Sequence, residues 1–560
     1  MGDSGRRLVG YGLATLLAAF TYFYGLDSPH IPKNGDEYPY EHITRLTAES
    51  GRLLPLQSEL PGMRNTKPPL LFWQGIASTD WGRRFTLWDL RYPSVAYTLL
   101  TAVLVFLLGS RLSGRLETGF VAGLGFLAFF STYRYGRPFL TNPPEVFWLF
   151  LPFFALLYWP KATAASRFAF PILAGVAIGV ALLYKSFALV VPAGLGLAGW
   201  YLRSRDNRLG VFLARDSWKV LITLSVSLAL FSAWFLLDPD PGAVWREFVL
   251  GENLGKFHPP GGYLPRLLWG NSSLWALALG FPLNAGLLCF PVLALFVLAW
   301  RRRKELSEEE RGLWTWVVTF FIVYAVPSQR SSRYLLPAMP ALAVLLALGW
   351  RQIPRWVLAP CLLASGVVVG VIATLSFGLQ QALPGPRLYT VAHWALLAGV
   401  ATVVLAALVV PALTRPLLHA AVFLCTLSFA AFFRPIDASL GRYDVGAQRQ
   451  VVGREVWVPV DFVAKEEGYR FLLPGACVRA YREERDTRAA FLLAQYPLVV
   501  IRRPLRDGGA LSGRVLGERL DLRGRQTASE IREILRGHVL EHLFVREQLI
   551  EARPGATGPR

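Results

Sequence analysis

Charged residues are scarce in this chain of 560 residues. Asp, Glu, Lys and Arg together make up 17% of it, against about 25% in a typical soluble protein. Hydrophobic residues make up 53%, and long apolar runs recur from Leu8 to Phe433. The composition therefore excludes a string of soluble domains and indicates a protein that crosses a membrane many times.

Cysteine is also rare. Three of the four cysteines, Cys289, Cys361 and Cys425, lie in apolar runs, and only Cys477 lies in a polar region. No disulfide can form within that polar region, and no zinc-type cysteine cluster exists. Lys and Arg outnumber Asp and Glu by 58 to 38. Because the basic residues lie largely in short loops and in the C-terminal tail, anionic lipid headgroups explain the loop charges better than a nucleic acid does.

Thirteen segments approach the roughly 20 apolar residues that a spanning helix needs. The first follows two arginines and lacks a small-residue cleavage site, which predicts a retained anchor and not a removed signal peptide. The predicted fold class is a multi-spanning α-helical membrane protein with about 13 transmembrane helices and a small C-terminal α/β domain. The thirteen segments are 8–25, 92–110, 118–133, 143–159, 168–184, 187–202, 219–237, 276–300, 313–327, 334–350, 356–377, 391–413 and 416–433.

The charges of the loops predict the orientation. With a cytoplasmic N-terminus, 19 basic residues of the short segments lie in the cytoplasm and 6 lie outside, as the positive-inside rule requires. Residues 26–91, 238–275 and 434–560 are too polar to span, and this topology places all three outside. The expected domains are thus a transmembrane catalytic domain, 1–433, with outer loops 26–91 and 238–275, and an extracytoplasmic soluble domain, 434–560.

The tail has the pattern of a small α/β domain. Val456–Val463 and Pro497–Arg502 are predicted to be strands. Thr527 and Glu530 form a capping-box signature, which predicts a helix that runs at least to Arg536.

The first outer loop carries acidic residues close to a span. Asp36 and Glu37 follow the first apolar run, so both carboxylates are expected near the outer membrane surface, where a charge is costly without a task or a partner. Pro39 is placed to begin a short helix over Tyr40–Ser50, and Gly51 is placed to end it. Taken alone, an Asp-Glu pair in a loop is most often a solvated turn or a helix cap.

Two further motifs follow in this loop. Lys67–Pro69 is predicted to be extended because of its two prolines, and the aromatic continuation Leu70–Trp73 suits the bilayer interface. Arg91–Ser94 then enters the second span. A single Lys-Pro-Pro is more often a stiff linker than a phosphate site, so the order and spacing of the motifs carry more weight than any one of them.

In this order and spacing the motifs resemble bacterial membrane glycosyltransferases of the GT-C type, in particular the aminoarabinose transferases that modify lipid A and the protein O-mannosyltransferases. The resemblance covers about residues 8–435, and it implies a GT-C fold with an exported tail. The matching elements are Asp36-Glu37, the step from Gly51 to Pro55, Lys67-Pro68-Pro69-Leu70, Arg91-Tyr92-Pro93-Ser94, Arg137 to Asn142, Lys185 with Ser186 and Pro192, and Arg333-Tyr334-Leu335-Leu336-Pro337 with Pro340.

The same residues suit the chemistry of transfer from a polyprenyl phosphate. A carboxylate must take the proton of the acceptor hydroxyl, and cations must stabilise the departing phosphate. Asp36 is the predicted base, with Glu37 beside it. Lys67, Lys185 and Arg333 are predicted to bind the donor phosphate, the arginine in a fork. The alternative for each cation is a side chain that reaches the lipid headgroups.

The resemblance adds three residues to the donor-phosphate set, namely Tyr334, Arg137 and, in the second outer loop, His258. Aminoarabinose transferases have a His in this loop that can share a metal with a Glu preceding the Lys-Pro-Pro lysine. Here Thr66 stands at that position, so no cofactor is assigned and a divalent metal stays an open alternative.

One position departs from the family pattern. Relatives usually have Asp after Thr141, where this chain has Asn142, and Glu145 follows three residues later. An amide cannot accept a proton, although Asn142 can hydrogen-bond a sugar hydroxyl or Asp36. Glu145 either caps a helix N-terminus or replaces the missing carboxylate beside Asp36 or as the partner of Arg137 or Lys185.

The predicted function is that of an inverting glycosyltransferase on the outer face of the bacterial cytoplasmic membrane. Its partners would be a polyprenyl-phosphate-linked sugar, with undecaprenyl phosphate as the carrier, an acceptor that is lipid A, another glycan or a protein, and the bilayer, but no nucleic acid. The alternatives are a lipid-linked glycan polymerase or ligase, a transporter or flippase, which would carry polar residues deep within interrupted spans, and a scaffold whose exported tail is the working part.

Overall fold

A computed structural model describes residues 3–32, 34–253, 262–383, 387–483, 489–507, 509, 511–524 and 526–553. The chain divides into two compact units. The first comprises Met1–Leu26, Ile43–Ser365 and Val403–Phe423, and the second comprises Asp27–His42, Gly366–Thr402 and Leu424–Arg560. The second unit thus combines a short piece of the loop 26–91 with the apolar segment Gly366–Thr402 and the C-terminal part of the chain.

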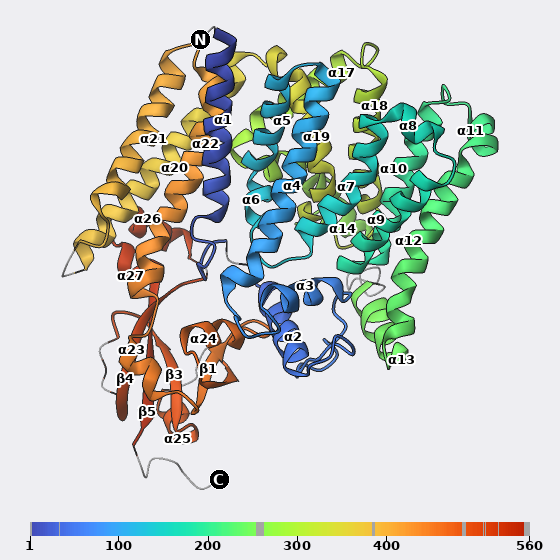
Figure 1. Cartoon of the computed structure of the whole chain (residues 1–560). Helices are drawn as coiled ribbons and strands as arrows, with labels where there is room; N and C mark the ends of the chain where they lie inside the picture. The colour runs from blue at the N-terminus through green and yellow to red at the C-terminus, as the bar shows by residue number, and fades with distance from the viewer. Residues whose placement is uncertain are drawn as a thin grey trace. The chain divides into compact units, whose positions relative to one another are not determined.

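The first unit is helical (Figure 1). Its longer helices are α1 (Asp3–Phe23), α3 (Leu70–Ser78), α4 (Leu87–Ser113), α5 (Leu116–Ala128), α6 (Phe130–Gly136), α7 (Asn142–Tyr158), α9 (Ala169–Tyr184), α10 (Val190–Arg203), α12 (Ser217–Leu237), α17 (Cys289–Arg301), α18 (Glu308–Ala325) and α19 (Met339–Gly349). Shorter elements join them: α8 (Pro160–Ala165), η1 (Phe187–Leu189), α11 (Leu209–Arg215), α13 (Pro241–Val244), η2 (Trp245–Asn253), α14 (Tyr263–Leu268), α15 (Leu274–Ala278), α16 (Gly280–Ala285), η4 (Gly286–Leu288), η5 (Ser332–Ala338) and η6 (Trp350–Gln352). Four helices contribute residues to both units: α2 (Glu37–Glu49), α20 (Arg355–Ala382), α21 (Val391–Val409) and α22 (Thr414–Pro435).

Each of the thirteen apolar segments coincides with helical structure. Among the described residues, seven helices are long and apolar enough to cross a membrane, or eight if α5 and α6, which are bent by 61° at their junction, form one span. Three further apolar helices are shorter, at Leu8–Phe23, Ala169–Tyr184 and Phe187–Arg203. The chain is therefore a multi-pass helical membrane protein.

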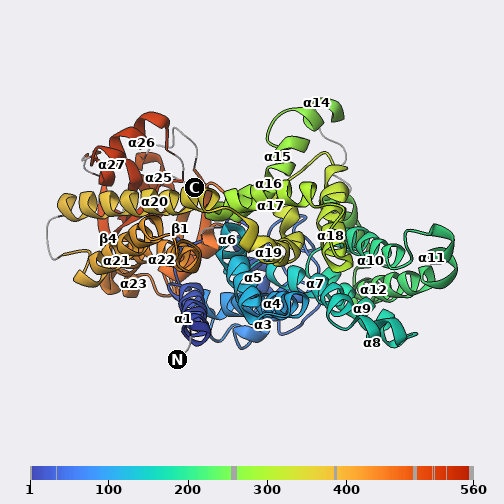
Figure 2. The same ribbon diagram turned by 90° about the horizontal axis from the view of Figure 1, so that it is seen from above.

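Small residues bring the helices of the first unit close together. Helices α9 and α12 lie side by side (Figures 1 and 2), and the hydroxyls of Thr223 and Ser227 each donate a hydrogen bond of 3.0 Å to a carbonyl of α9. A Cβ on Gly175 would lie 2.8 Å from the carbonyl oxygen of Thr223. Close backbone approach and interhelical hydrogen bonds are the usual means of helix association where water is absent.

The second unit contains a five-stranded sheet with the order β2-β1-β3-β5-β4. The strands are β1 (Glu455–Val460), β2 (Cys477–Arg482), β3 (Leu498–Arg503), β4 (Gly513–Leu522) and β5 (Phe544–Ala552). Strand β1 is parallel to β2 and β3, whereas β5 is antiparallel to β3 and β4. Short helices accompany the sheet: α23 (Val445–Gln450), α24 (Glu466–Leu472), α25 (Ala489–Gln495), α26 (Ala528–Leu535) and α27 (Val539–Leu543), with the π-helix η7 (Ile436–Leu440) between α22 and α23.

The structure confirms the predicted elements of the tail. Strands β1 and β3 lie where the sequence predicted strands, although β1 ends three residues earlier than predicted, at Val460. Helix α26 begins at the predicted capping box, in which both reciprocal hydrogen bonds of Thr527 and Glu530 are present, and it ends at Leu535, one residue before the predicted minimum of Arg536. Apolar residues of β1 and β3 pack on both faces of the sheet, for example Val458 on one face and Ile501 on the other.

Two local predictions for the first outer loop were wrong. Helix α2 begins at Glu37 and not near Tyr40, since proline is tolerated in the first turn of a helix, where its missing N–H has no helical partner, and an acidic residue there is favoured by the helix dipole. Pro69 is not extended but has helical dihedral angles as the residue before α3. The aromatic stretch after Lys67 is thus helical, and Gly51, with a φ of +68°, follows the end of α2 as predicted.

Candidate functional site

A group of charged and polar side chains in the first unit contains five of the predicted site residues, namely Lys67, Lys185, Glu145, Asn142 and Arg333. Lys67 precedes α3, and its Nζ lies 2.6 Å from Oε1 of Glu252 at the end of η2. The next residue of η2, Asn253, accepts a hydrogen bond of 2.7 Å from the hydroxyl of Ser186. The loops 26–91 and 238–275 therefore meet at the turn between α9 and η1, which carries Lys185.

Lys185 is paired with Glu145. Its Nζ lies 2.6 Å from Oε2 of this carboxylate, which is fully buried in the first turn of α7. Asn142 donates a hydrogen bond of 3.0 Å to the same oxygen and accepts one of 2.7 Å from Nε of Arg333 in η5. A continuous chain of contacts thus runs from Lys185 through Glu145 and Asn142 to Arg333. The sequence analysis considered Asp36, Arg137 and Lys185 as partners of Glu145. Within the first unit, the contact that Glu145 makes is with Lys185.

The cations of this group act on one another. Burial lowers the pKa of Lys185 below its ordinary value, the charge of Glu145 opposes this, and the positive charges of Arg333 and Lys67 lower the pKa further. Two carboxylates, Glu145 and Glu252, lie among these three cations. Among the described residues Oε1 of Glu145 has no hydrogen-bond partner. We call Lys67, Lys185, Arg333, Glu145 and Glu252 the charged cluster, and its three cations suit an anionic ligand.

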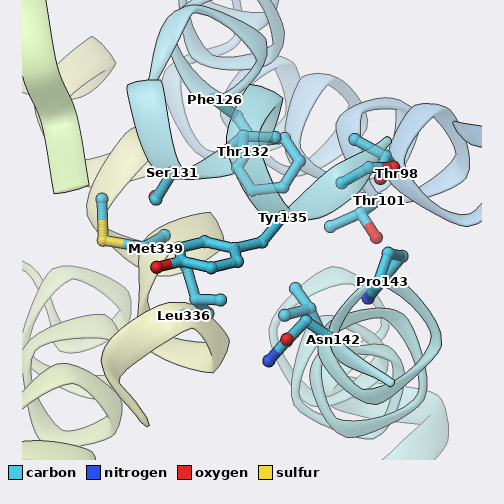
Figure 3. Close-up of a pocket in the computed structure, with 12 residues that line it drawn as sticks. Thr98, Thr101, Phe126, Ser131, Thr132, Tyr135, Asn142, Pro143, Leu336 and Met339 are labelled. Atoms are coloured by element: carbon cyan, nitrogen blue, oxygen red, sulfur yellow. Dashed lines mark hydrogen bonds between the residues drawn. The ribbon is translucent and has the colours of Figure 1, made fainter. Parts of the chain in front are cut away.

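A pocket of about 310 Å³ adjoins the charged cluster. Asn142 lines it, together with Tyr135, over whose ring the guanidinium of Arg333 lies at 5.1 Å. Figure 3 shows the ring of Tyr135 reaching toward Leu336 and Met339. The other lining residues are Thr98, Thr101, Phe126, Ser131, Thr132, Gly136, Pro143 and Val146. The pocket is therefore largely apolar, with several hydroxyl groups.

The other residues predicted to bind the donor phosphate are Tyr334, Arg137 and His258, and they do not all lie beside the charged cluster. Tyr334 lies beside the charged cluster, with its ring centroid 5.9 Å from Nζ of Lys185. Arg137 is fully buried and donates to the carbonyl oxygens of Tyr22 and Tyr24 at 2.9 and 2.7 Å. These contacts satisfy carbonyls at the end of α1, so the structure gives Arg137 a structural role, and its contact with phosphate stays a prediction. His258 lies outside the described residues.

The predicted base belongs to the second unit. Asp36 is half-buried just before α2, and its backbone N–H donates to the side-chain oxygen of Asn34 at 3.1 Å. Glu37 begins α2 and is 3% exposed. Both lie in the segment 27–42, which is grouped with the C-terminal domain.

Sequence reasoning did not identify Glu252 and Asn253, which lie at the end of η2. Each contacts a segment that carries a predicted lysine: Glu252 contacts Lys67 itself, and Asn253 contacts Ser186, the residue after Lys185. A carboxylate at a membrane face was the signal available for Glu252. Within the described parts of the chain there is no group of three or more His, Cys, Asp or Glu side chains suited to a metal ion.

Comparison with known proteins indicates the class of enzyme to which this site belongs. The family model for dolichyl-phosphate-mannose-protein mannosyltransferases matches residues 13–245, a range that includes Asp36, Lys67, Glu145 and Lys185. The predicted resemblance to polyprenyl-phosphate-dependent membrane glycosyltransferases of the GT-C type is confirmed. This chain is a membrane glycosyltransferase.

The relatives define the resemblance more narrowly. The chain is 28% identical over 393 residues to undecaprenyl phosphate-α-4-amino-4-deoxy-L-arabinose arabinosyl transferase 1 of Sodalis glossinidius, covering 68% of this chain and 67% of the relative. It is 25% identical over 404 residues to arabinosyl transferase 2 of Proteus mirabilis, covering 69% and 68%. The crystal structure of ArnT from Cupriavidus metallidurans bound to undecaprenyl phosphate matches with a TM-score of 0.63 at 16% identity over the whole of both chains, and its apo state matches with a TM-score of 0.60. The two proteins therefore share a fold.

Proposed function

We propose that this enzyme moves a sugar from undecaprenyl phosphate to a hydroxyl of a cell-envelope acceptor, with inversion at the sugar carbon. The observation that supports the proposal most directly is the charged cluster, in which Lys67 and Lys185 are paired with carboxylates and Arg333 is joined to Lys185 through Asn142 and Glu145. The relatives act on undecaprenyl phosphate-linked aminoarabinose, so this pentose is the first donor sugar to test. Lipid A, another glycan or a protein is the acceptor.

The chemistry requires one proton transfer and one departing phosphate. The acceptor oxygen attacks the sugar C1 atom, the bond from C1 to the phosphate oxygen breaks, and the polyprenyl phosphate leaves with one additional negative charge. Asp36 takes the proton of the acceptor hydroxyl, with Glu37 beside it. Lys67, Lys185 and Arg333, with Tyr334 beside Lys185, stabilise the departing phosphate. These roles for Asp36 and for the cations are proposals from residue chemistry.

Mass spectrometry of envelope components tests this function. Lipid A, surface polysaccharide and exported proteins are compared from cells with and without the gene. We expect one of them to lose a pentose or hexose when the gene is absent and to regain it on complementation. Unchanged masses in all three fractions, with the gene expressed in the parent cells, would contradict the proposed function.

The finer topology forms part of the same proposal. The thirteen helical segments are all spans, the N-terminus lies in the cytoplasm, and the outer loops 26–91 and 238–275 and the domain 434–560 lie outside. A reporter that works only outside the cytoplasm, fused after Arg560, should be active, whereas one fused in the arginine-rich loop 301–304 should be silent. Activity of a cytoplasm-only reporter after Arg560 would overturn this topology, because either the orientation of the N-terminus or the odd number of spans would then be wrong.

Replacing Lys67 tests the role of the cluster in donor binding. Lys67→Ala should weaken the affinity for undecaprenyl phosphate about tenfold or more, because a hydrogen bond to a charged group contributes about 1.5–3 kcal/mol. Lys67→Arg should restore little of it, because the guanidinium is broader than the ammonium that fits Glu252 at 2.6 Å. Affinity is measured by titrating purified enzyme with the lipid phosphate. The control is Arg83→Ala, which removes a largely exposed cation of the same loop. If both Ala variants bind the lipid phosphate as tightly as the parent, Lys67 does not bind the donor phosphate and its side chain contacts lipid headgroups instead.

A further inference from the structure

The segment that carries the proposed base is held by the C-terminal domain. Residues 27–42 lie in the first outer loop of the sequence, yet they are grouped by their contacts with the second unit, whereas the chain on either side is grouped with the first. Their contacts lie at both ends of the segment and at its centre. Asp36 and Glu37 stand between these points of attachment.

The N-terminal attachment is a buried histidine between two carboxylates. Nδ1 of His30 lies 2.6 Å from Oδ1 of Asp437 in η7, and Nε2 lies 3.5 Å from Oδ1 of Asp521 in β4. The three side chains are 3, 4 and 9% exposed, and the imidazole stacks on Phe433 at 6.1 Å. Since an ionised carboxylate only accepts hydrogen bonds, the geometry suits an imidazolium that donates from both nitrogens.

The C-terminal attachment is a second buried histidine. Nδ1 of His42 lies 2.8 Å from Oε1 of Glu467 in α24, and the two side chains are 2% and 1% exposed. Between the two histidines the segment touches the connection between β1 and α24. A Cβ on Gly35 would lie 3.0 Å from the ring of Phe462, and one on Gly468 would lie 3.0 Å from the ring of Tyr38.

Stability alone is a weak reason for this arrangement. Replacing buried paired polar groups by well-packed apolar side chains of the same volume is often neutral or stabilising, and in some proteins such pairs are retained because they specify position. Here the specified position is that of a segment with Asp36 six residues after His30 and Glu37 five residues before His42. We infer that the C-terminal domain positions the Asp36–Glu37 pair for catalysis, with His30 and His42 as positioning residues. This inference rests on the proposed role of Asp36.

The test combines turnover with hydrogen exchange of the intact enzyme. In His30→Gln and His42→Gln we expect kcat to fall ~10–100-fold, an estimate from the cost of small misplacement in active sites, with donor KM changed less than about threefold. Amides of residues 34–42 should exchange faster, while strands β1, β3 and β5 keep their protection. His42→Asn, which keeps a donor near the position of Nδ1, should retain more turnover than His42→Leu. The matched control is His538→Gln, since His538 makes a similar contact of 3.0 Å with Glu533 but is 62% exposed.

A positioning role also predicts non-additive effects and a pH profile. If His30 acts through Asp36, adding His30→Gln to Asp36→Asn should lower kcat no further. Burial by itself lowers the pKa of His30, but hydrogen bonds to Asp437 and Asp521 outweigh it and hold that pKa above its ordinary value. The attachment is therefore present below the unfolded-state pKa of about 6.5 and is lost as pH rises through the raised value. The exchange of residues 34–42, corrected for intrinsic rates, should increase over that alkaline range in the parent but not in His30→Gln.

Each contrary outcome has a definite meaning. Turnover within twofold of the parent in both Gln variants overturns the inference, as does a loss that adds to that of Asp36→Asn. Loss of protection in β1, β3 and β5 in every His30 and His42 variant assigns the histidines to the folding of the domain and also overturns it. Full turnover of Asp36→Asn alone would instead refute the proposed base, while the exchange of residues 34–42 would still report whether the histidines hold the segment.

Discussion

Asp36→Asn should lower the rate of sugar transfer by ~10²–10⁴-fold, the usual contribution of a general base. Asparagine has the shape of aspartate, but its amide does not accept the proton of the acceptor hydroxyl at neutral pH. Since Lys67, Lys185 and Arg333 are unchanged, binding of undecaprenyl phosphate should persist. Single-turnover transfer with purified enzyme and a separate titration with the lipid phosphate measure the two effects.

The same segment offers a matched control. Asp27 lies in residues 27–42 as well, but its carboxylate pairs with Arg434 at 3.0 Å and is 43% exposed. Asp27→Asn should therefore keep turnover within about twofold, in line with the small contribution of exposed ion pairs. Near-full turnover of Asp36→Asn, or an equal loss in both variants, would refute the assignment of Asp36 as the base.

Glu145→Gln should be the second severe variant, with transfer reduced by ~10²-fold or more, comparable to the loss of one preorganised electrostatic contact. The change removes the carboxylate that lies 2.6 Å from Nζ of Lys185 and 3.0 Å from the amide of Asn142. Nζ of Lys185 then faces an amide in place of that carboxylate, so charge no longer fixes its position against the donor phosphate that we propose it binds. Turnover and donor affinity, measured as for Asp36, distinguish a catalytic loss from a binding loss.

An exchange of the two side chains makes this prediction more specific. In Glu145→Gln combined with Asn142→Asp, the carboxylate and the amide trade positions along α7. The new carboxylate still accepts from Nε of Arg333, where the present contact is 2.7 Å, and the charge of the cluster is unchanged. The double variant should therefore regain much of the turnover that Glu145→Gln loses, and Asn142→Asp alone should be tolerated because two cations flank the added charge.

The control for this pair is Glu117→Gln, which removes a carboxylate paired with Arg351 at 2.9 Å, outside the charged cluster. It should leave transfer unchanged. If Glu145→Gln also leaves transfer intact while Asn142→Ala abolishes it, a second carboxylate in α7 is not needed, and Asp36 and Glu37 carry the proton chemistry alone.

The positions of the membrane helices could be predicted from the sequence because the constraint is local. A chain in a bilayer must satisfy its own backbone hydrogen bonds, so a run such as 219–237 becomes a helix, here α12 at Ser217–Leu237, whatever its neighbours are. The capping box at Thr527 is equally local, and it begins α26 as predicted. Strand β2 escaped prediction because its burial does not alternate cleanly, and its place at the edge of the sheet depends on pairing with β1 across the intervening α24.

The sequence by itself determined the class of molecule and the residue types of the candidate site. It indicated a multi-pass membrane protein with a small α/β tail, and it singled out Asp36, Lys67, Lys185, Arg333 and Glu145 from the order of short motifs. Tertiary structure alone decided which of these charges meet. The pairing of Lys185 with Glu145, 40 residues apart, and of Lys67 with Glu252, 185 residues apart, depends on how helices pack, and no local pattern encodes it. The contacts that attach residues 27–42 to the C-terminal domain, made by His30 and His42, join residues more than 400 positions apart in the sequence. No local pattern predicts them, because each histidine lies next to its carboxylate only in the folded chain.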